Sequence, residues 1–350
     1  MIGFIILFCF IAFGFLFVHN RSLFIKYVGL CLIIFMGLRN PLDYIMDNIT
    51  VYDIWVYYDH YSMSILAERP IGNFNSWEFS YSYLVFLCSK IIRWPQFILF
   101  LEAIIYISLM LGFINKYSKH IIVSIMCFLA LGPWIFSLSA FRQAISIAII
   151  SAAIGLLYER KWIKYTLAVL FASTFHQTAL LILPFSYFIM MSNSFRKKLI
   201  CSLVIGGILF ILGNSIFIFA NTSFLRNSFE GRAVGSWLNG IINVILFLIT
   251  IILASIGCRN NKDFKAQNEY LLFFCIWGFF FYIMRYQTQL FERISFYFFP
   301  CLCVLLPNSI SNYFSNVQYK KWSLVALTIL CVFLYFKRSF EIFYSQTYIL

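Results

Sequence analysis

Long apolar runs recur from one end of this sequence to the other, and they constrain the fold more than any other feature. Many of them approach or exceed the roughly 20 residues that span the hydrocarbon core of a bilayer. Of the 350 residues, 62% are hydrophobic and 11% are charged, and the mean hydropathy is +0.87. A soluble domain does not have this balance, and a β-barrel would show short alternating segments instead. The sequence therefore predicts an all-α fold, a polytopic transmembrane helical bundle.

The apolar runs divide the chain into candidate spans. They cover residues 1–18, 23–38, 96–114, 121–138, 143–158, 162–175, 177–191, 199–219, 239–257, 270–284, 290–307 and 322–337. The polar stretches between them are too short for a separate soluble domain. We therefore expect about 11–12 spans in a single integral membrane domain that covers residues 1–350.

Two segments fit a simple spanning helix poorly. Residues 79–94, FSYSYLVFLCSKIIRW, are short and charged at one end. We expect them to form an amphipathic helix at the outer surface, inside an outer loop of residues 39–95. Residues 162–191 are too long for one helix, so they predict a helical hairpin whose tip, at His176, points outward. If residues 79–94 spanned instead, Lys116 and Lys119 would lie outside.

With the N-terminus outside, this layout separates the two basic residue types. The inner set is Arg21, Lys116, Lys119, Arg160, Lys161, Lys164, Arg196, Lys197, Lys198, Arg259, Lys262, Lys265, Lys320 and Lys321, as the positive-inside rule requires. The outer arginines are Arg39, Arg69, Arg93, Arg142, Arg226, Arg232, Arg285, Arg293 and Arg338, whereas the outer lysines are only Lys90 and Lys337. Because guanidinium groups bind phosphate bidentately, the outer arginines indicate a phosphate-bearing ligand. The alternative is that they pair with the acidic loop or reach lipid headgroups.

The longest polar segment, residues 39–78, combines acidic and aromatic side chains. The acids are Asp43, Asp47, Asp53, Asp59, Glu68 and Glu78, and the aromatic residues include Tyr44, Tyr52, Tyr57, Tyr58, Tyr61, Trp55 and Trp77. Carboxylates and aromatic faces suit a carbohydrate, although an aromatic belt at the membrane interface is the alternative. The segment has no D-x-D, and the ten cysteines of the chain form no C-x-x-C pair and no zinc-spaced cluster with histidine. We expect neither a metal nor another cofactor.

Several stretches on the predicted outer face carry a family resemblance. They are GLRNPLDYIMDNITVY (37–52) with WEFSYSYL (77–84), AFRQAISIAI (140–149), ASTFHQTALLILP (172–184) and FERISFYFFP (291–300). In order and spacing they resemble the EpsG-like branch of the Wzy-type O-antigen and exopolysaccharide polymerases. The resemblance implies roles for Arg39, Glu78, the pair Arg142–Gln143, His176 and Arg293.

The sequence departs from the family pattern at two places. The family often has a glycine shortly before its first aspartate, whereas this chain has Asn40, Pro41 and Leu42 before Asp43. The match to the Asp and Tyr positions is therefore open between Asp43–Tyr44 and Asp47–Tyr52. Glu78 is followed by Phe79 and Ser80 in place of the family's Pro-Gly-like turn, so its role stays open.

What the resemblance implies is a membrane glycosyltransferase of the GT-C type in the bacterial inner membrane, with its active site facing the periplasm. It would join oligosaccharide repeat units carried on undecaprenyl diphosphate, which serve as donor and acceptor. Membrane lipid and a chain-length-regulating membrane protein are the other candidate partners, and no nucleic acid is expected. The alternatives are a flippase or transporter of a lipid-linked oligosaccharide and an O-antigen ligase.

The reaction needs cationic donors for a leaving diphosphate and a base for the acceptor hydroxyl. Ser139, Arg142, Gln143 and Ser146 share one helical face by their spacing, so this face predicts a diphosphate site. The alternative for Arg142 is an inter-helix salt bridge, for instance with Glu102 or Glu292. If one helix runs through 285–297, Arg285, Gln289, Arg293 and Tyr297 form a second stripe that could clamp a diphosphate.

Histidine chemistry near neutral pH makes His176 a candidate base or phosphate donor, and the alternative is a structural histidine at the hairpin tip. Glu78 and the loop aspartates are rival bases. The candidate site as a whole is therefore catalytic His176, Glu78 and Arg142, with substrate-binding Gln143, Arg285, Arg293, Arg39, Asp47, Tyr52 and Gln289.

Overall fold

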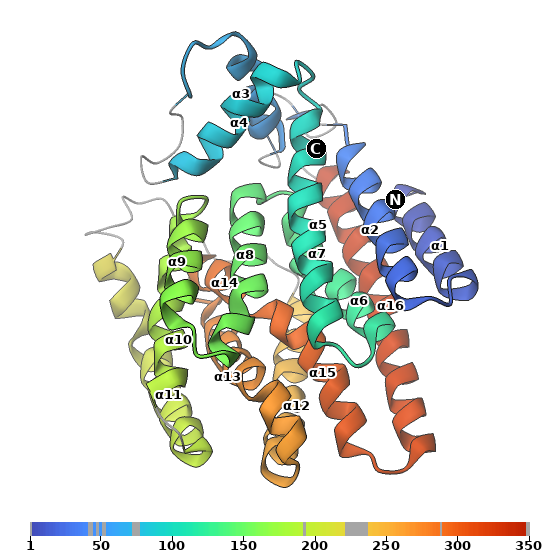
Figure 1. Cartoon of the computed structure of the whole chain (residues 1–350), viewed down its shortest axis with the longest axis vertical. Coiled ribbons are helices and arrows are strands. Elements are labelled where there is room, and N and C mark those ends of the chain that lie inside the picture. Colours follow the sequence, from blue (N-terminus) through green and yellow to red (C-terminus); the bar gives the residue numbers. More distant parts are fainter. Residues whose placement is uncertain are drawn as a thin grey trace.

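The computed structural model describes residues 2–40, 45–46, 49–50, 54–71, 78–191, 194–220, 237–287 and 289–347, and these residues are overwhelmingly helical (Figure 1). The first half contains α1 (Ile2–Phe17), α2 (Arg21–Gly37), α3 (Ile54–Leu66), α4 (Phe79–Ile91), α5 (Phe97–Tyr117), α6 (Ile121–Ala130), α7 (Pro133–Ser137) and α8 (Phe141–Tyr158). The second half contains α9 (Trp162–Ser173), the 3-10 helix η2 (Gln177–Leu181), α10 (Ile182–Met191), α11 (Phe195–Ala220), α12 (Trp237–Asn260), α13 (Lys262–Met284), α14 (Gln289–Ser295), α15 (Phe299–Tyr313) and α16 (Val317–Thr347). Two-residue strands β1 (Ile45–Met46) and β2 (Ile49–Thr50) pair antiparallel.

Length and composition support the membrane assignment. Within the described residues, four helices are long and apolar enough to cross a bilayer: Phe97–Tyr117, Phe141–Tyr158, Gly240–Asn260 and Val317–Phe340. Four shorter apolar segments accompany them: Ile2–Phe17, Ile121–Ala130, Trp162–Ser173 and Gln177–Ile189. The predicted all-α, polytopic bundle is confirmed.

Two segments expected as single spans are each divided in two. Residues 121–138 divide into α6 and α7 because Gly132 takes a φ of +128°, a conformation that only glycine adopts easily, and Pro133 then starts a new helix. Residues 290–307 divide into α14 and α15, with Pro300 in the first turn of α15.

The segment expected as a loop before residue 79 contains a helix that the sequence analysis did not anticipate. α3 packs against α4, and both lie at one end of the molecule, beyond the N-terminal ends of α5 and α8 (Figure 1). α4 occupies the segment expected to be amphipathic. Tyr57 and Tyr61 of α3 bury against Tyr81 and Val85 of α4, because the aromatic residues of α3 recur at helical spacing on one face.

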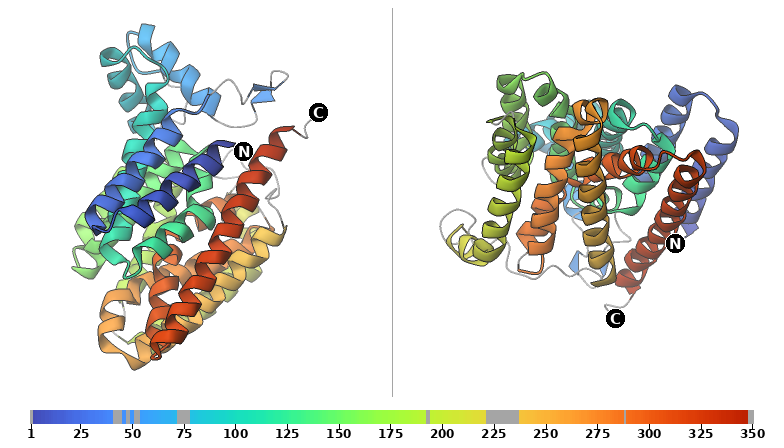
Figure 2. Two further views of the ribbon diagram at one scale, coloured as in Figure 1. Left: turned by 90° about the vertical axis from the view of Figure 1, so that its right-hand side faces the viewer. Right: turned by 90° about the horizontal axis from the view of Figure 1, so that it is seen from below.

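Two apolar cores hold the helices. The larger core runs through the bundle, in which α12 packs on α13, α2 on α5 and α8 on α9. The smaller core joins α3 and α4 to the first turns of α5 and α8 and to Phe175. The last helix, α16, lies beside α1 (Figure 2), where the hydroxyl of Tyr335 donates to the carbonyl of Phe4 at 3.0 Å. The smaller core fixes the end of the bundle at which the candidate site lies.

Candidate active site

One carboxylate, Glu78, joins three distant parts of the chain. Its Oε2 accepts a hydrogen bond from Nη1 of Arg142, at the start of α8. Its Oε1 lies 2.9 Å from Nδ1 of His176, in the turn between α9 and η2. The same Oε1 accepts from the backbone N–H of Gln177 at 3.0 Å. The three predicted catalytic residues therefore form one cluster, in which Glu78 is only 3% exposed.

The turn at His176 is tied to the start of α4 by further hydrogen bonds. The N–H of Ser80 donates to the carbonyl of Thr174 at 3.2 Å, and the hydroxyl of Thr174 donates to that of Ser80 at 2.7 Å. Phe175 is buried in the smaller core. His176 follows directly on Thr174 and Phe175, so its place beside Glu78 is fixed by the packing of these two residues as well as by its contact with the carboxylate.

Arg142 is oriented by the aromatic residues around it. Its neighbour Phe141 stacks on Tyr57 with the ring centroids 4.5 Å apart. The hydroxyl of Tyr57 accepts a further hydrogen bond from Arg142. The expected alternative, a salt bridge from Arg142, is present, but its partner is Glu78 and not Glu102 or Glu292. Both carboxyl oxygens of Glu102 are buried without a hydrogen-bond partner among the described residues.

The environment sets the protonation of the acid and the imidazole. Burial raises the pKa of the Glu78 carboxyl, but His176, Arg142 and the N–H of Gln177 together outweigh it, and the pKa lies below its usual value. Burial is also the largest influence on the pKa of His176 and lowers it. Glu78 opposes that effect, Arg142 and Arg293 reinforce it, and the pKa ends below its usual value of 6.5.

At neutral pH the pair is therefore a carboxylate and a neutral imidazole. Because a carboxylate can only accept, the 2.9 Å contact with Glu78 favours the tautomer of His176 whose proton is on Nδ1. Nε2 then keeps its lone pair, and it is buried without a hydrogen-bond partner among the described residues. The arrangement can hold a base and can place a cation beside it.

Gln143 and the segment 293–297 extend the cluster. The side-chain amide of Gln143 donates to the carbonyl of Arg293 at 2.7 Å, and Gln143 is 2% exposed. The hydroxyl of Tyr297 lies 3.1 Å from that of Thr178 and donates to that of Ser146 at 3.2 Å. The predicted face of α8 thus contacts the predicted late segment. Arg293 contributes two features to the cluster. Its backbone carbonyl accepts the hydrogen bond from Gln143, and its positive charge acts on His176.

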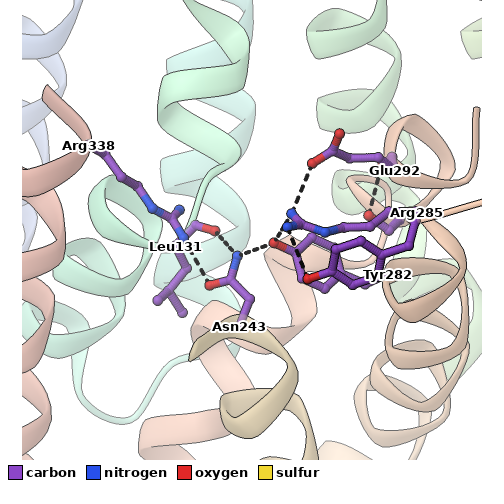
Figure 3. Close-up of polar contacts among 8 residues, drawn as sticks. Leu131, Asn243, Tyr282, Arg285, Glu292 and Arg338 are labelled. Carbon is purple, nitrogen blue, oxygen red and sulfur yellow. Dashed lines mark hydrogen bonds and ion pairs between the residues drawn. The ribbon is translucent and has the colours of Figure 1, made fainter. Parts of the chain in front are cut away.

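Arg285 belongs to a second polar cluster, shown in Figure 3. Its Nη1 lies 3.2 Å from Oε1 of Glu292 and donates to the hydroxyl of Tyr282 at 2.7 Å. The amide of Asn243 donates to the same hydroxyl at 3.0 Å, and Nη2 of Arg338 donates to Asn243 Oδ1 at 3.0 Å. The cluster connects α12, α13, α14 and α16.

The expected single helix through residues 285–297 is wrong. α13 ends at Met284 and α14 starts at Gln289, so Arg285 and Arg293 do not share one helical stripe. Arg285 is instead 3% exposed and pairs with Glu292. Its predicted contact with a diphosphate stays a prediction.

Arg39 lies at the end of α2 and is buried. Its Nε donates to the carbonyl of Met36 at 2.9 Å, its Nη1 donates to the carbonyl of Leu138, and its guanidinium carbon lies 5.4 Å from the ring centroid of Phe141. Arg39 therefore supports the start of α8 through backbone and ring contacts. Asp47 and Tyr52 lie outside the described residues, and so does the side chain of Gln289.

The family of this chain is shown by its match to a family model. A model of the EpsG family matches residues 22–349, nearly the whole chain. This chain belongs to the EpsG family. The EpsG family is a Wzy-like polysaccharide polymerase family, so its function is in general that of a membrane polysaccharide repeat-unit polymerase. Among curated proteins and among solved structures, none matches the chain significantly.

Sequence reasoning missed several partners of the site in this EpsG-family chain. Tyr57 was one of many loop tyrosines, and nothing in its spacing to Arg142 singled it out. Asn243 and Arg338 were not candidates, although an amide inside the apolar run of α12 is a signal of an internal polar contact. The backbone N–H of Gln177 carries no sequence signal at all.

Proposed function

We propose that this protein polymerises oligosaccharide repeat units carried on undecaprenyl diphosphate, at the periplasmic face of the bacterial inner membrane. The growing chain is the donor and an incoming lipid-linked unit is the acceptor. Donor and acceptor are both linked to a lipid. Both substrate partners therefore reach the site through the bilayer. The proposal goes beyond the family assignment in naming the carrier lipid, the membrane face and the residues.

The observation that carries the proposal is the sharing of Glu78 between Arg142 and His176. A carboxylate bound to the Nδ1 side of a buried neutral histidine orients the ring and stabilises the imidazolium that forms when Nε2 takes a proton. A guanidinium on the other carboxylate oxygen places positive charge beside that base. Glycosyl transfer from a diphosphate needs a base and a cation at one place.

In the proposed step, the acceptor hydroxyl oxygen bonds to the anomeric carbon of the donor while the bond from that carbon to the diphosphate oxygen breaks. The diphosphate leaves with the electron pair, and the hydroxyl proton moves to Nε2 of His176. Arg142 and Arg293 supply positive charge for the leaving diphosphate, whose charge rises as the bond breaks. Glu78 stabilises the protonated His176.

The first test is the gel profile of surface polysaccharide from a strain that lacks the gene. The strain is complemented with wild type, Arg142→Ala or Arg93→Ala, at matched protein levels in the membrane. Arg93 is a matched control because it is an exposed arginine just beyond α4. Losing one preorganised cationic donor costs about 10²–10³ in rate, so Arg142→Ala should leave one repeat unit where wild type and Arg93→Ala give a ladder.

The other outcomes contradict the proposal in different ways. Loss of even the single unit in the deletion strain would favour the flippase or the ligase. An intact ladder in the deletion strain would exclude a polymerase. A normal ladder with Arg142→Ala would keep the polymerase and remove Arg142 from its mechanism.

A further inference from the structure

A second site lies at the opposite end of the bundle from Glu78. There, the turn between α1 and α2 and the turn between α5 and α6 border a cavity of about 490 Å³. Its polar lining consists of His19, Arg21, Lys119 and His120. Among the described residues that line it, none is an aspartate or a glutamate. The cavity is therefore basic, and an anionic ligand would complement its charge.

One cation is held in position by the neighbouring helix. Nε of Arg21 donates to the side-chain oxygen of Asn115 at 3.1 Å, and its Nη2 donates to the carbonyl of Asn115 at 2.6 Å. Within the part of the chain that the structure describes, Nη1 of Arg21 has no such acceptor. A fixed guanidinium with free N–H groups suits a phosphate oxygen.

The start of α6 adds a second favourable feature. Ile121, Ile122 and Val123 open this ten-residue helix at the cavity, and its N-cap, His120, makes no side-chain hydrogen bond to the first turn. The positive end of the helix dipole thus faces the cavity. Burial lowers the pKa of His120, and the charges of Lys320 and Lys119 lower it further. His120 is therefore a neutral donor at pH 7, and Arg21 and Lys119 are the fixed cations.

The rest of the lining is apolar, and this feature distinguishes a lipid from a soluble anion. Phe15 and Phe24 line the cavity, and Phe15 is 52% exposed on α1. α1 also exposes Phe13 and Phe17, which lie about half a turn around the helix from Phe15, so its surface is apolar on both sides. Cationic groups beside an apolar helix face suit a molecule with a charged head and acyl chains, and basic pockets between membrane helices bind anionic headgroups.

We propose that this cavity binds the headgroup of an anionic phospholipid, with the phosphate between Arg21 and Lys119 and the acyl chains along α1. The site is independent of the polymerisation step, because it lies at the other end of the bundle from His176. A zwitterionic lipid offers less net negative charge to the two cations. The proposal therefore predicts discrimination by headgroup charge.

The test is native mass spectrometry of the purified full-length protein in neutral detergent, titrated with phosphatidylglycerol or phosphatidylcholine. Wild type should bind one phosphatidylglycerol preferentially. The double variant Arg21→Gln, Lys119→Gln should bind it more weakly, by about fivefold for each cation removed. The double variant Lys197→Gln, Lys262→Gln removes the same charge from exposed positions and should bind as wild type does.

A third variant keeps the proposal testable if the first double variant folds poorly. Ile122→Trp fills the cavity and keeps every cation, and it should also weaken binding. Equal weakening in both double variants would reduce the effect to general surface charge and overturn the site. Equal binding of phosphatidylcholine would exclude recognition of headgroup charge. A parallel titration uses undecaprenyl phosphate, and preferential binding of it over phosphatidylglycerol would assign the cavity to the carrier lipid instead.

Discussion

The two polar clusters of this protein use the same residue types in different ways. Around Glu78, one carboxylate is shared by an arginine and by a histidine whose Nε2 has no partner among the described residues. Around Arg285, one arginine is bound by a carboxylate, Glu292, and by the phenol of Tyr282. The first cluster therefore contains a nitrogen that is able to accept a proton. In the second, the polar groups connect four helices.

The difference teaches that an intramembrane arginine is not by itself a ligand site. Arg142 lies in the first turn of α8 and Arg285 directly follows α13, and both have an acidic partner. What separates them is the third group: an imidazole with an open nitrogen at Arg142, and phenol and amide groups at Arg285. We expect chemistry from the first cluster and stability from the second.

The strongest test of this comparison is His176→Gln. A positioned general base contributes about 10²–10⁴ in rate, so the variant should lose polymerisation by that factor while its level in the membrane stays normal. The rate is measured with a lipid-linked repeat unit in proteoliposomes. His60→Gln is the matched control, because His60 is also buried and its Nε2 donates to the Ile71 carbonyl at 3.2 Å.

His60→Gln should retain most of the activity. If His176→Gln were as active as wild type, the open nitrogen would have no role, and the two clusters would differ only in composition.

The next effect concerns Arg285→Ala, which leaves the half-buried Glu292 without the cation that it pairs with. Breaking a buried ion pair costs about 3–5 kcal/mol, and the partial exposure of Glu292 places the expected loss near the lower end. The purified protein should unfold at a lower temperature, and polymerisation should fall only as far as folded protein does.

The double replacement Arg285→Met with Glu292→Leu separates the two roles. Because neither member of the ion pair is then left without the other, it should recover most of the thermal stability. If Arg285→Ala instead kept its unfolding temperature and abolished polymerisation, Arg285 would act on the diphosphate. The contrast between the clusters would then disappear.

The sequence identified candidate site residues best where two separate arguments, the chemistry of the side chain and its predicted side of the membrane, pointed to the same residue. Glu78, Arg142 and His176 were named separately, and the positive-inside rule placed all three on one side of the membrane. That they touch could not be predicted, since the contact depends on Ser80 and Thr174 and on a core that includes an unanticipated helix, α3. The break at Gly132 escaped prediction for a similar reason, because an apolar run conceals a local change of backbone direction.

The smallest effect is a shift in pH dependence. His176 must be neutral to accept a proton, and burial lowers its pKa below 6.5, so activity should fall only at a pH below that value. The Glu78 carboxylate raises the pKa of His176 against this trend. Removing it in Glu78→Gln leaves burial and the charges of Arg142 and Arg293, so the pKa falls further. The acid limb of the residual activity should therefore move to lower pH.

The matched control for this shift is Glu68→Gln, which removes an exposed carboxylate from the segment that follows α3. It should leave the acid limb where wild type has it. A shift of Glu78→Gln to higher pH would contradict the assignment of His176 as the base, because removing a neighbouring negative charge lowers the pKa of an imidazole. An unchanged limb would mean that the group which limits the rate lies outside this cluster, and Glu78 would then only hold Arg142 in place.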